Sequence, residues 1–200
     1  MNRKGQRRKL WTSSCLVLVT LLTAMVQGTT VVPPSFEQLV GEAEVVFEGE
    51  VIDTKARLSR EPEGETIFTD VYFRVRKVLK GTVGSVTVLE FLGGTVGDRT
   101  FSVDGMPSFS IGDRDVIFAS PSLRLVSPLV GMMHGRVRIT TDQATNQDLV
   151  RRFDGSLIRG VGVFESSEHQ PLLSSTPAMS LSAFEAAVVA RAARTKVRAQ

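Results

Sequence analysis

The sequence predicts a mainly β protein with one short helix near its start and another at its end. Apolar and polar residues alternate in several runs between residues 45 and 141, which is typical of strands with one buried face. Glycine and proline clusters separate these runs, and no helical pattern lies between neighbouring ones. Five or six strands in a sandwich or barrel are therefore expected.

Residues 1–28 have the organisation of an export signal. Five basic residues and no acidic residue precede an apolar run from Leu16 to Val26. Eleven residues are too few to span a bilayer, which needs about 20. Small residues follow, so we expect cleavage after Gly28 and a secreted or periplasmic protein without a stable membrane anchor. A retained anchor is the alternative.

Removal of this segment changes the charge and the chemistry of the chain. The net charge of +3 becomes −2 without the five basic residues of the signal, so the broad positive field that nucleic-acid binding uses is not expected. Cys15 and Trp11 also lie in the signal. The mature protein would therefore lack disulfides, thiolate metal ligands and the tryptophan that favours carbohydrate binding.

After the signal, three regions are expected: a β-barrel domain over residues 29–140, a polar extension over 141–179 and a C-terminal helix over 180–200. The first helix is predicted over 36–42, where Ser35 and Gln38 form a capping-box pattern, and Ser182 with Glu185 repeats that pattern for the last helix. The predicted strands cover residues 45–52, 66–79, 86–91, 99–103, 116–120 and 135–141, and a charged loop covers 58–65.

The segment "LKGTVGS", residues 79–85, could be a phosphate-binding loop or a hairpin turn. A phosphate loop needs Gly-Lys-Ser/Thr followed by a helix, but Lys80 precedes Gly81 and a strand follows. We therefore expect a hairpin turn in which Gly81 or Gly84 has φ > 0. An exposed Lys80 would contribute little to stability.

No enzyme signature stands out, so a non-catalytic protein without cofactor or metal is predicted. The serine-hydrolase motif Gly-x-Ser-x-Gly is absent, and no short spacing pairs His134 with His169. Asp113 and Asp115 flank Arg114 and could project together as a carboxylate pair for calcium or acid–base chemistry. Turn-forming acids are the favoured interpretation of this pair.

The solvent-facing side of the strand over residues 66–79 is the candidate binding surface. Tyr72, Arg74 and Arg76 alternate there with the apolar Val71 and Phe73, and tyrosine and arginine are favoured at binding hot spots. An ordinary solvated strand face is the alternative.

Several segments occur in an order that resembles a group of small exported bacterial proteins of unknown function. They are "GEAEVVFEGEVI", "VYFRVRKVLKG", "VTVLEFLGG", "VDGMPSFSIGDRDVIFAS" and "LVGMMHGRVRI". This group is similar to the netrin-like module of the tissue inhibitors of metalloproteinases. The corresponding motifs are Ala43–Val46, Leu79–Gly81 and Gly112-Asp113 before Val116–Phe118. The resemblance implies an OB-like barrel of five or six strands, flanked by the two helices.

The chain departs from those inhibitors in the elements that bind the protease. They chelate its zinc through an N-terminal cysteine held by disulfides, and the expected mature protein has no cysteine. No inhibitory residue therefore carries over. We expect a secreted, non-catalytic barrel that binds a protein partner, with an extracellular protease among the candidates. The alternative is a small-ligand binder or an enzyme with an unrecognised site.

Overall fold

A computed structural model describes residues 33–61, 64–123, 127–164 and 176–198. The expected signal, residues 1–28, lies outside these ranges, and so does His169. Within them, no helix has the length and apolar character needed to cross a membrane.

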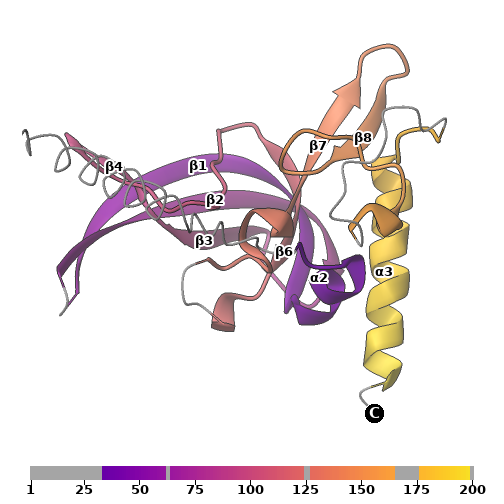
Figure 1. The fold of residues 1–200 in the computed structure, drawn as a ribbon, viewed down its shortest axis with the longest axis horizontal. Coiled ribbons are helices and arrows are strands. Elements are labelled where there is room, and N and C mark those ends of the chain that lie inside the picture. The colour runs from indigo at the N-terminus through magenta and orange to yellow at the C-terminus, as the bar shows by residue number, and fades with distance from the viewer. Residues whose placement is uncertain (1–32, 62–63, 124–126, 165–175, 199–200) are drawn as a thin grey trace, which may run out of the picture. The chain divides into compact units, whose positions relative to one another are not determined.

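An antiparallel sheet of six strands, in the order β3-β2-β1-β6-β7-β8, is the main feature of the unit that starts at Pro33 (Figure 1). Its strands are β1 (Val45–Glu61), β2 (Gly64–Lys80), β3 (Val86–Leu92), β6 (Arg114–Ala119), β7 (Arg136–Asp142) and β8 (Gln147–Arg151). Strands β4 (Gly94–Val96) and β5 (Arg99–Phe101) form a separate two-stranded ribbon. The mainly β prediction is confirmed.

The predicted number of strands, five or six, is wrong, because the described residues form eight. In these ranges no ladder joins β3 to β8, so no closed barrel is formed. The expected charged loop over residues 58–65 also belongs to strands, since β1 and β2 pair as far as Glu61 and Gly64. Opposite charges face each other across this hairpin, as in the pair Arg60–Glu65, which lets polar strands pair in water.

The first helix, α2 (Phe36–Glu42), has the predicted bounds and cap. The Gln38 backbone N–H donates to Ser35 Oγ at 3.1 Å, and the Ser35 N–H donates to Gln38 Oε1 at 2.8 Å. The helix buries Leu39 and Val40. Three 3₁₀ segments follow later in the chain: η1 (Pro121–Leu123), η2 (Met132–Gly135) and η3 (Val161–Phe164).

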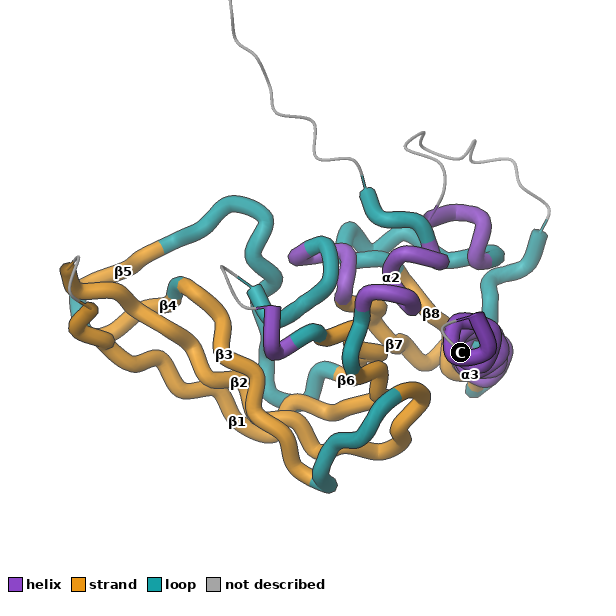
Figure 2. Tube along the Cα trace, turned by 90° about the horizontal axis from the view of Figure 1, so that it is seen from below, coloured by secondary structure: helices purple, strands orange, loops and turns teal. Residues whose placement is uncertain are grey.

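The last helix, α3 (Leu181–Arg198), forms as predicted but with a different cap. Ser180 Oγ accepts from the Ala183 N–H at 3.2 Å. Glu185 does not reach back to the helix start, because Lys77 Nζ on β2 binds its carboxylate at 2.6 Å. Figure 2 shows α3 end-on beside β8.

Two hydrophobic clusters lie on opposite faces of the sheet, because side chains alternate along each strand. One contains Val46 together with residues of α2 and α3, including Phe184 and Val188. The other contains Phe47 and is covered by the segment after β5, through Met106 and Phe109.

Part of the segment 141–179 differs from the expected polar extension. It contains β8, and its Val150, Ile158 and Phe164 are buried in the cluster with α3. These apolar residues are widely spaced and follow neither a helical nor a strand period. Only the neighbouring β7 and α3 bring them into one core, so periodicity could not reveal them.

The hairpin predicted at residues 79–85 is present between β2 and β3. Gly81 has φ +73°. The expectation for Lys80 was wrong: its ammonium does not stand free in solvent but binds the end of α2. Lys80 Nζ donates to the carbonyl oxygens of Val40 at 2.6 Å, Gly41 at 3.1 Å and Ala43 at 2.6 Å.

Replacing Lys80 with methionine should therefore lower the free energy of unfolding by about 1–3 kcal/mol, because unpaired carbonyl groups at the helix end lose charged donors. Urea unfolding monitored by circular dichroism measures this. Lys55→Met is the matched control, since Lys55 is exposed and its partners in the described part of the chain, Asp53 and Tyr72, are side chains rather than helix-end carbonyls. Equal stability of Lys80→Met and the wild type would contradict the capping role.

Candidate functional site

The predicted binding residues Tyr72, Arg74 and Arg76 lie on the solvent side of β2. Phe73, between Tyr72 and Arg74, and Val71, just before Tyr72, are buried, as the alternation predicts. Arg74 and Arg76 share one carboxylate, with Glu50 Oε2 at 3.5 Å and 2.5 Å from their guanidinium nitrogens. The structure thus gathers these cations around a single acidic side chain.

The strand beside them, β3, is the terminal strand of the sheet over the described residues. Val86 lies opposite Arg74 and Val88 lies opposite Tyr72. Both valines are unusually exposed, at 53% and 41%. The sequence predicted this strand, but nothing in its local pattern indicated that it would be an edge.

The outer edge of β3 carries backbone groups available for a further strand. The N–H of Val75 bonds to Ser85 O at 2.8 Å, which sets the phase of the ladder with β2. In an antiparallel ladder, residues one position away from such a pair point their N–H and C=O to the opposite side. The backbone of Val86 and Val88 therefore faces away from β2.

A second group of polar residues lies where β6 begins. Asp113 and Asp115 both bind Arg136 of β7: Nη2 is 2.7 Å from Asp113 Oδ2, and Nε is 2.9 Å from Asp115 Oδ1. Arg114, between them in sequence, instead binds Glu48 and Asp148. The two aspartates thus project together, as the sequence allowed, but onto an arginine that the sequence did not indicate.

Burial makes Asp115 a weaker acid than an ordinary aspartate. Its side chain is fully inaccessible, and this desolvation raises its pKa to about 6 despite the opposing effect of Arg136. Its Oδ2 atom has no hydrogen-bond partner in the described part of the chain. Burial also acts to raise the pKa of Asp113, but the Ser110 N–H and Arg136 outweigh it, so that pKa lies below its ordinary value.

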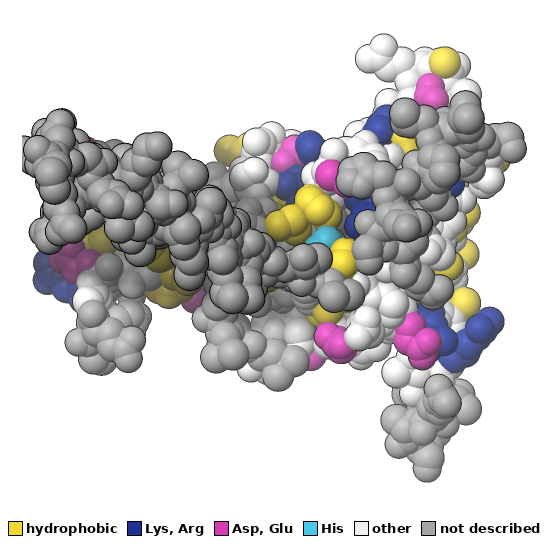
Figure 3. All heavy atoms as spheres, viewed as in Figure 1, with side chains coloured by type: hydrophobic (Ala, Val, Ile, Leu, Met, Phe, Trp, Pro, Cys, Tyr) yellow, Lys and Arg dark blue, Asp and Glu magenta, His cyan; other side chains and the backbone are white. Residues whose placement is uncertain are grey.

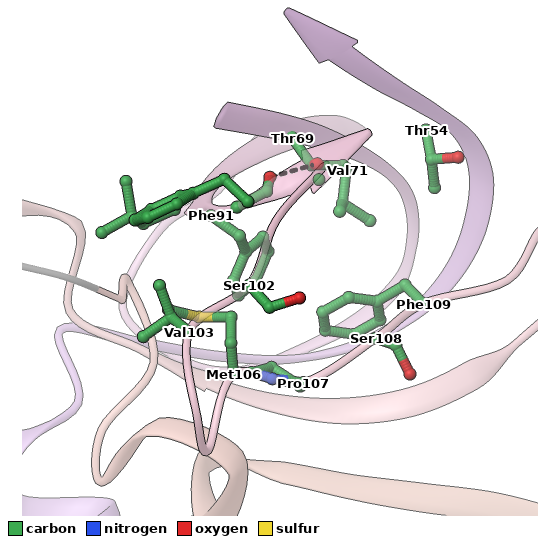
Figure 4. A pocket seen from close by; sticks show the side chains of 14 residues that line it. Thr54, Thr69, Val71, Phe91, Ser102, Val103, Met106, Pro107, Ser108 and Phe109 are labelled. Carbon is green, nitrogen blue, oxygen red and sulfur yellow. Dashed lines mark hydrogen bonds between the residues drawn. The ribbon is translucent and has the colours of Figure 1, made fainter. Parts of the chain in front are cut away.

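Two cavities share the segment Met106–Ser108 in their walls. The first, of about 290 Å³, is lined mainly by apolar side chains such as Phe91 and Phe109, with the Ser102 hydroxyl among them (Figure 4). The second, of about 380 Å³, is polar and contains Asp113, Arg136 and Arg138.

His134 takes part in packing rather than in a cluster of possible metal ligands. Its ring stands edge-on to Phe153, with centroids 4.8 Å apart, and burial lowers its pKa. Within the described ranges, no three histidine, cysteine, aspartate or glutamate side chains come together as metal ligands would.

Comparison of the chain with protein-family models, with curated proteins and with solved structures finds no match.

Proposed function

We propose that this is an exported, non-catalytic β protein that binds an extended segment of a protein partner along β3. An extracellular protease is among the candidate partners. The observation that carries the proposal is the exposed outer edge of β3, where Val86 and Val88 present both apolar side chains and backbone groups.

Natural sheets usually block an exposed edge with lysine, proline, a bulge or a covering segment. The β3 sequence, "VTVLEFL", contains neither lysine nor proline. The opposite terminal strand, β8, is covered, since Leu149 bridges to Ser180 and Arg151 to Leu157. An extended peptide added to β3 would gain main-chain hydrogen bonds, and its alternate side chains would contact the neighbouring face.

The neighbouring face indicates the chemistry of the partner. Arg74 and Arg76 share Glu50, so this part of the surface has one more positive than negative charge. Tyr72 and Val88 provide apolar area next to it. We infer that the bound segment carries an acidic residue that meets the arginines and an apolar residue that meets Val88.

Export and kinship are further parts of the proposal. The basic, apolar and small-residue regions of residues 1–28 support secretion or periplasmic localisation. The order of the motifs from Ala43 to Phe118 supports kinship with the netrin-like module and its OB-like architecture, even though the strand count differs. The near-neutral charge of the mature chain supports a protein partner over nucleic acid.

Val88→Pro should abolish binding of the partner without unfolding the protein. Proline removes the outward N–H of Val88 but no bond to β2, and proline is tolerated at such edge positions. Val88→Thr is the matched control, because it keeps the N–H and the shape of the side chain. The measurement is quantitative mass spectrometry of secreted proteins retained by each immobilised variant.

We expect proteins enriched by the wild type and by Val88→Thr to be at least tenfold depleted on Val88→Pro. Replacing Tyr72, Arg74 and Arg76 together with alanine should deplete the same proteins. Thermal midpoints of all variants establish that they fold. An identical set of proteins on every folded variant would place the interface away from β3.

A further inference from the structure

We propose that the 380 Å³ cavity beside β7 binds a small organic anion, with Arg138 as the residue that holds its carboxylate or phosphate group. This site lies apart from the β3 edge, and the proposal does not depend on the binding partner proposed above. The argument rests on the unused donors of Arg138, on two arginines that face each other across β7 and β8, and on the apolar side chains in the lining of the cavity.

Arg138 lines the cavity with almost all of its hydrogen-bonding capacity unused. Its side chain is 44% exposed, and its nearest acidic atom, Asp113 Oδ1, is 3.7 Å from Nη2. That separation is too long for a hydrogen bond. The Arg138 side chain makes no hydrogen bond to the described residues, although its charge acts to lower the pKa values of Asp113 and Asp115. A guanidinium offers paired donors that match a carboxylate or a phosphate.

Like charges also face each other at this position. Arg138 of β7 lies directly opposite Arg151 of β8, an arrangement that destabilises a sheet. Arg151 is held by Thr140 Oγ1 at 3.0 Å and by the Gly155 carbonyl at 2.9 Å, neither of which is charged. A bound anion would relieve this repulsion. Departures from local rules of this kind are expected at functional sites.

Arg136 provides a fixed guanidinium next to Arg138, with its charge balanced by two aspartates. It is bound to Asp113 and Asp115, and its guanidinium lies 4.3 Å from the ring centre of Phe109. It also donates to the Ser108 carbonyl. These contacts hold Arg136 in place before any ligand binds, so ordering it adds no entropy cost to binding.

Apolar side chains complete the lining of this mainly polar cavity and could contact the apolar part of a ligand. Met106, Met133 and Phe153 line the same cavity as the arginines, and methionine adapts its shape to different ligands. Charges of both signs lie close to hydrophobic side chains on the face shown in Figure 3. The volume is near the lower end of the about 300–1,000 Å³ typical of ligand cavities, which favours a ligand of about one ring.

Isothermal titration calorimetry of the protein with benzoate and with phenyl phosphate tests the site. The anion that binds with the higher affinity identifies the preferred charged group. Benzyl alcohol tests the need for charge, and inorganic phosphate tests the need for the ring. We expect saturable binding of at least one aromatic anion, with Arg138→Gln weakening it tenfold or more. Arg60→Gln, at the distant β1–β2 hairpin, should leave the affinity unchanged.

Equal affinity of wild type and Arg138→Gln for the aromatic anion would overturn the proposal, and so would the absence of binding by both anions. Inorganic phosphate binding as tightly as phenyl phosphate would overturn the role of the apolar lining. Without ligand, the thermal midpoint of Arg138→Gln should equal or exceed that of the wild type, because the repulsion with Arg151 is removed. A fall of several degrees would contradict the argument from like charges.

Discussion

Replacing Arg136 with methionine is expected to lower the free energy of unfolding at pH 7 by about 3–5 kcal/mol, because it leaves a buried carboxylate without its partner. Asp115 is fully buried, and its only ion pair within hydrogen-bonding distance in the described structure is the 2.9 Å contact with Arg136 Nε. The same substitution also removes the contacts of Arg136 with Asp113 and with the Ser108 carbonyl, which hold the segment that carries Phe109.

The pH dependence identifies Asp115 as the origin of this effect. Its pKa in the folded protein, about 6, exceeds its ordinary value of 3.8, so the folded state binds more protons between these values. The contribution of Asp115 to stability therefore falls as the pH rises from about 4 to about 6. Without Arg136 the pKa of Asp115 rises further. The loss of unfolding free energy in Arg136→Met, relative to the wild type, should therefore be smaller at pH 5 than at pH 7.

Urea unfolding at the two pH values measures both effects. The double variant Asp115→Asn with Arg136→Met is the matched control, because it removes the buried charge together with its partner. We expect it to be more stable at pH 7 than Arg136→Met. Its stability deficit relative to the wild type should be smaller at pH 7 than at pH 5, because only the wild type loses stability through Asp115 over that range. A deficit of Arg136→Met that is the same at both pH values would rule out Asp115 as its cause.

Gly81→Ala is expected to lower the free energy of unfolding by about 3 kcal/mol or more, because the new methyl group meets both backbone strain and a steric clash. At φ +73° a side chain costs about 1 kcal/mol. In addition, a Cβ atom at Gly81 would lie 2.3 Å from the carbonyl oxygen of Glu44. That oxygen belongs to the backbone beside β1 and cannot move without disturbing the strand.

Gly84→Ala is the control from the same turn. Gly84 does not have a positive φ, and its Cβ would lie 3.3 Å from Val86 O, a tight contact but not an overlap. We expect its cost to stay below about 1 kcal/mol. Chemical denaturation of both variants compares them directly. Equal losses in the two variants would contradict the assignment of the strain and the clash to Gly81.

The candidate sites show which parts of a surface can be predicted from sequence. Period-two alternation placed Tyr72 and Arg74 on one face of β2, since each residue's side is set by its immediate neighbours. That β3 would be the edge beside them depends on which strands pair. Likewise, the spacing of Asp113 and Asp115 allowed them to converge, but their partner Arg136 is 21 residues further on from Asp115.

The sequence by itself determined the features that depend on neighbouring residues. These are the mainly β class, the hairpin at Gly81 and helix α2 with its cap at Ser35. Each follows from interactions a few residues apart, whose geometry is largely the same in any fold.

Only the tertiary structure decided the strand order, the length of the β1–β2 hairpin, the burial of Val150 and Ile158, and the capping of α2 by Lys80. These features join residues that are tens of positions apart, and each side chain has many possible partners at that range. The choice among them is made by the packing of the whole sheet and its helices, because a buried group is stable only where that packing supplies its contacts.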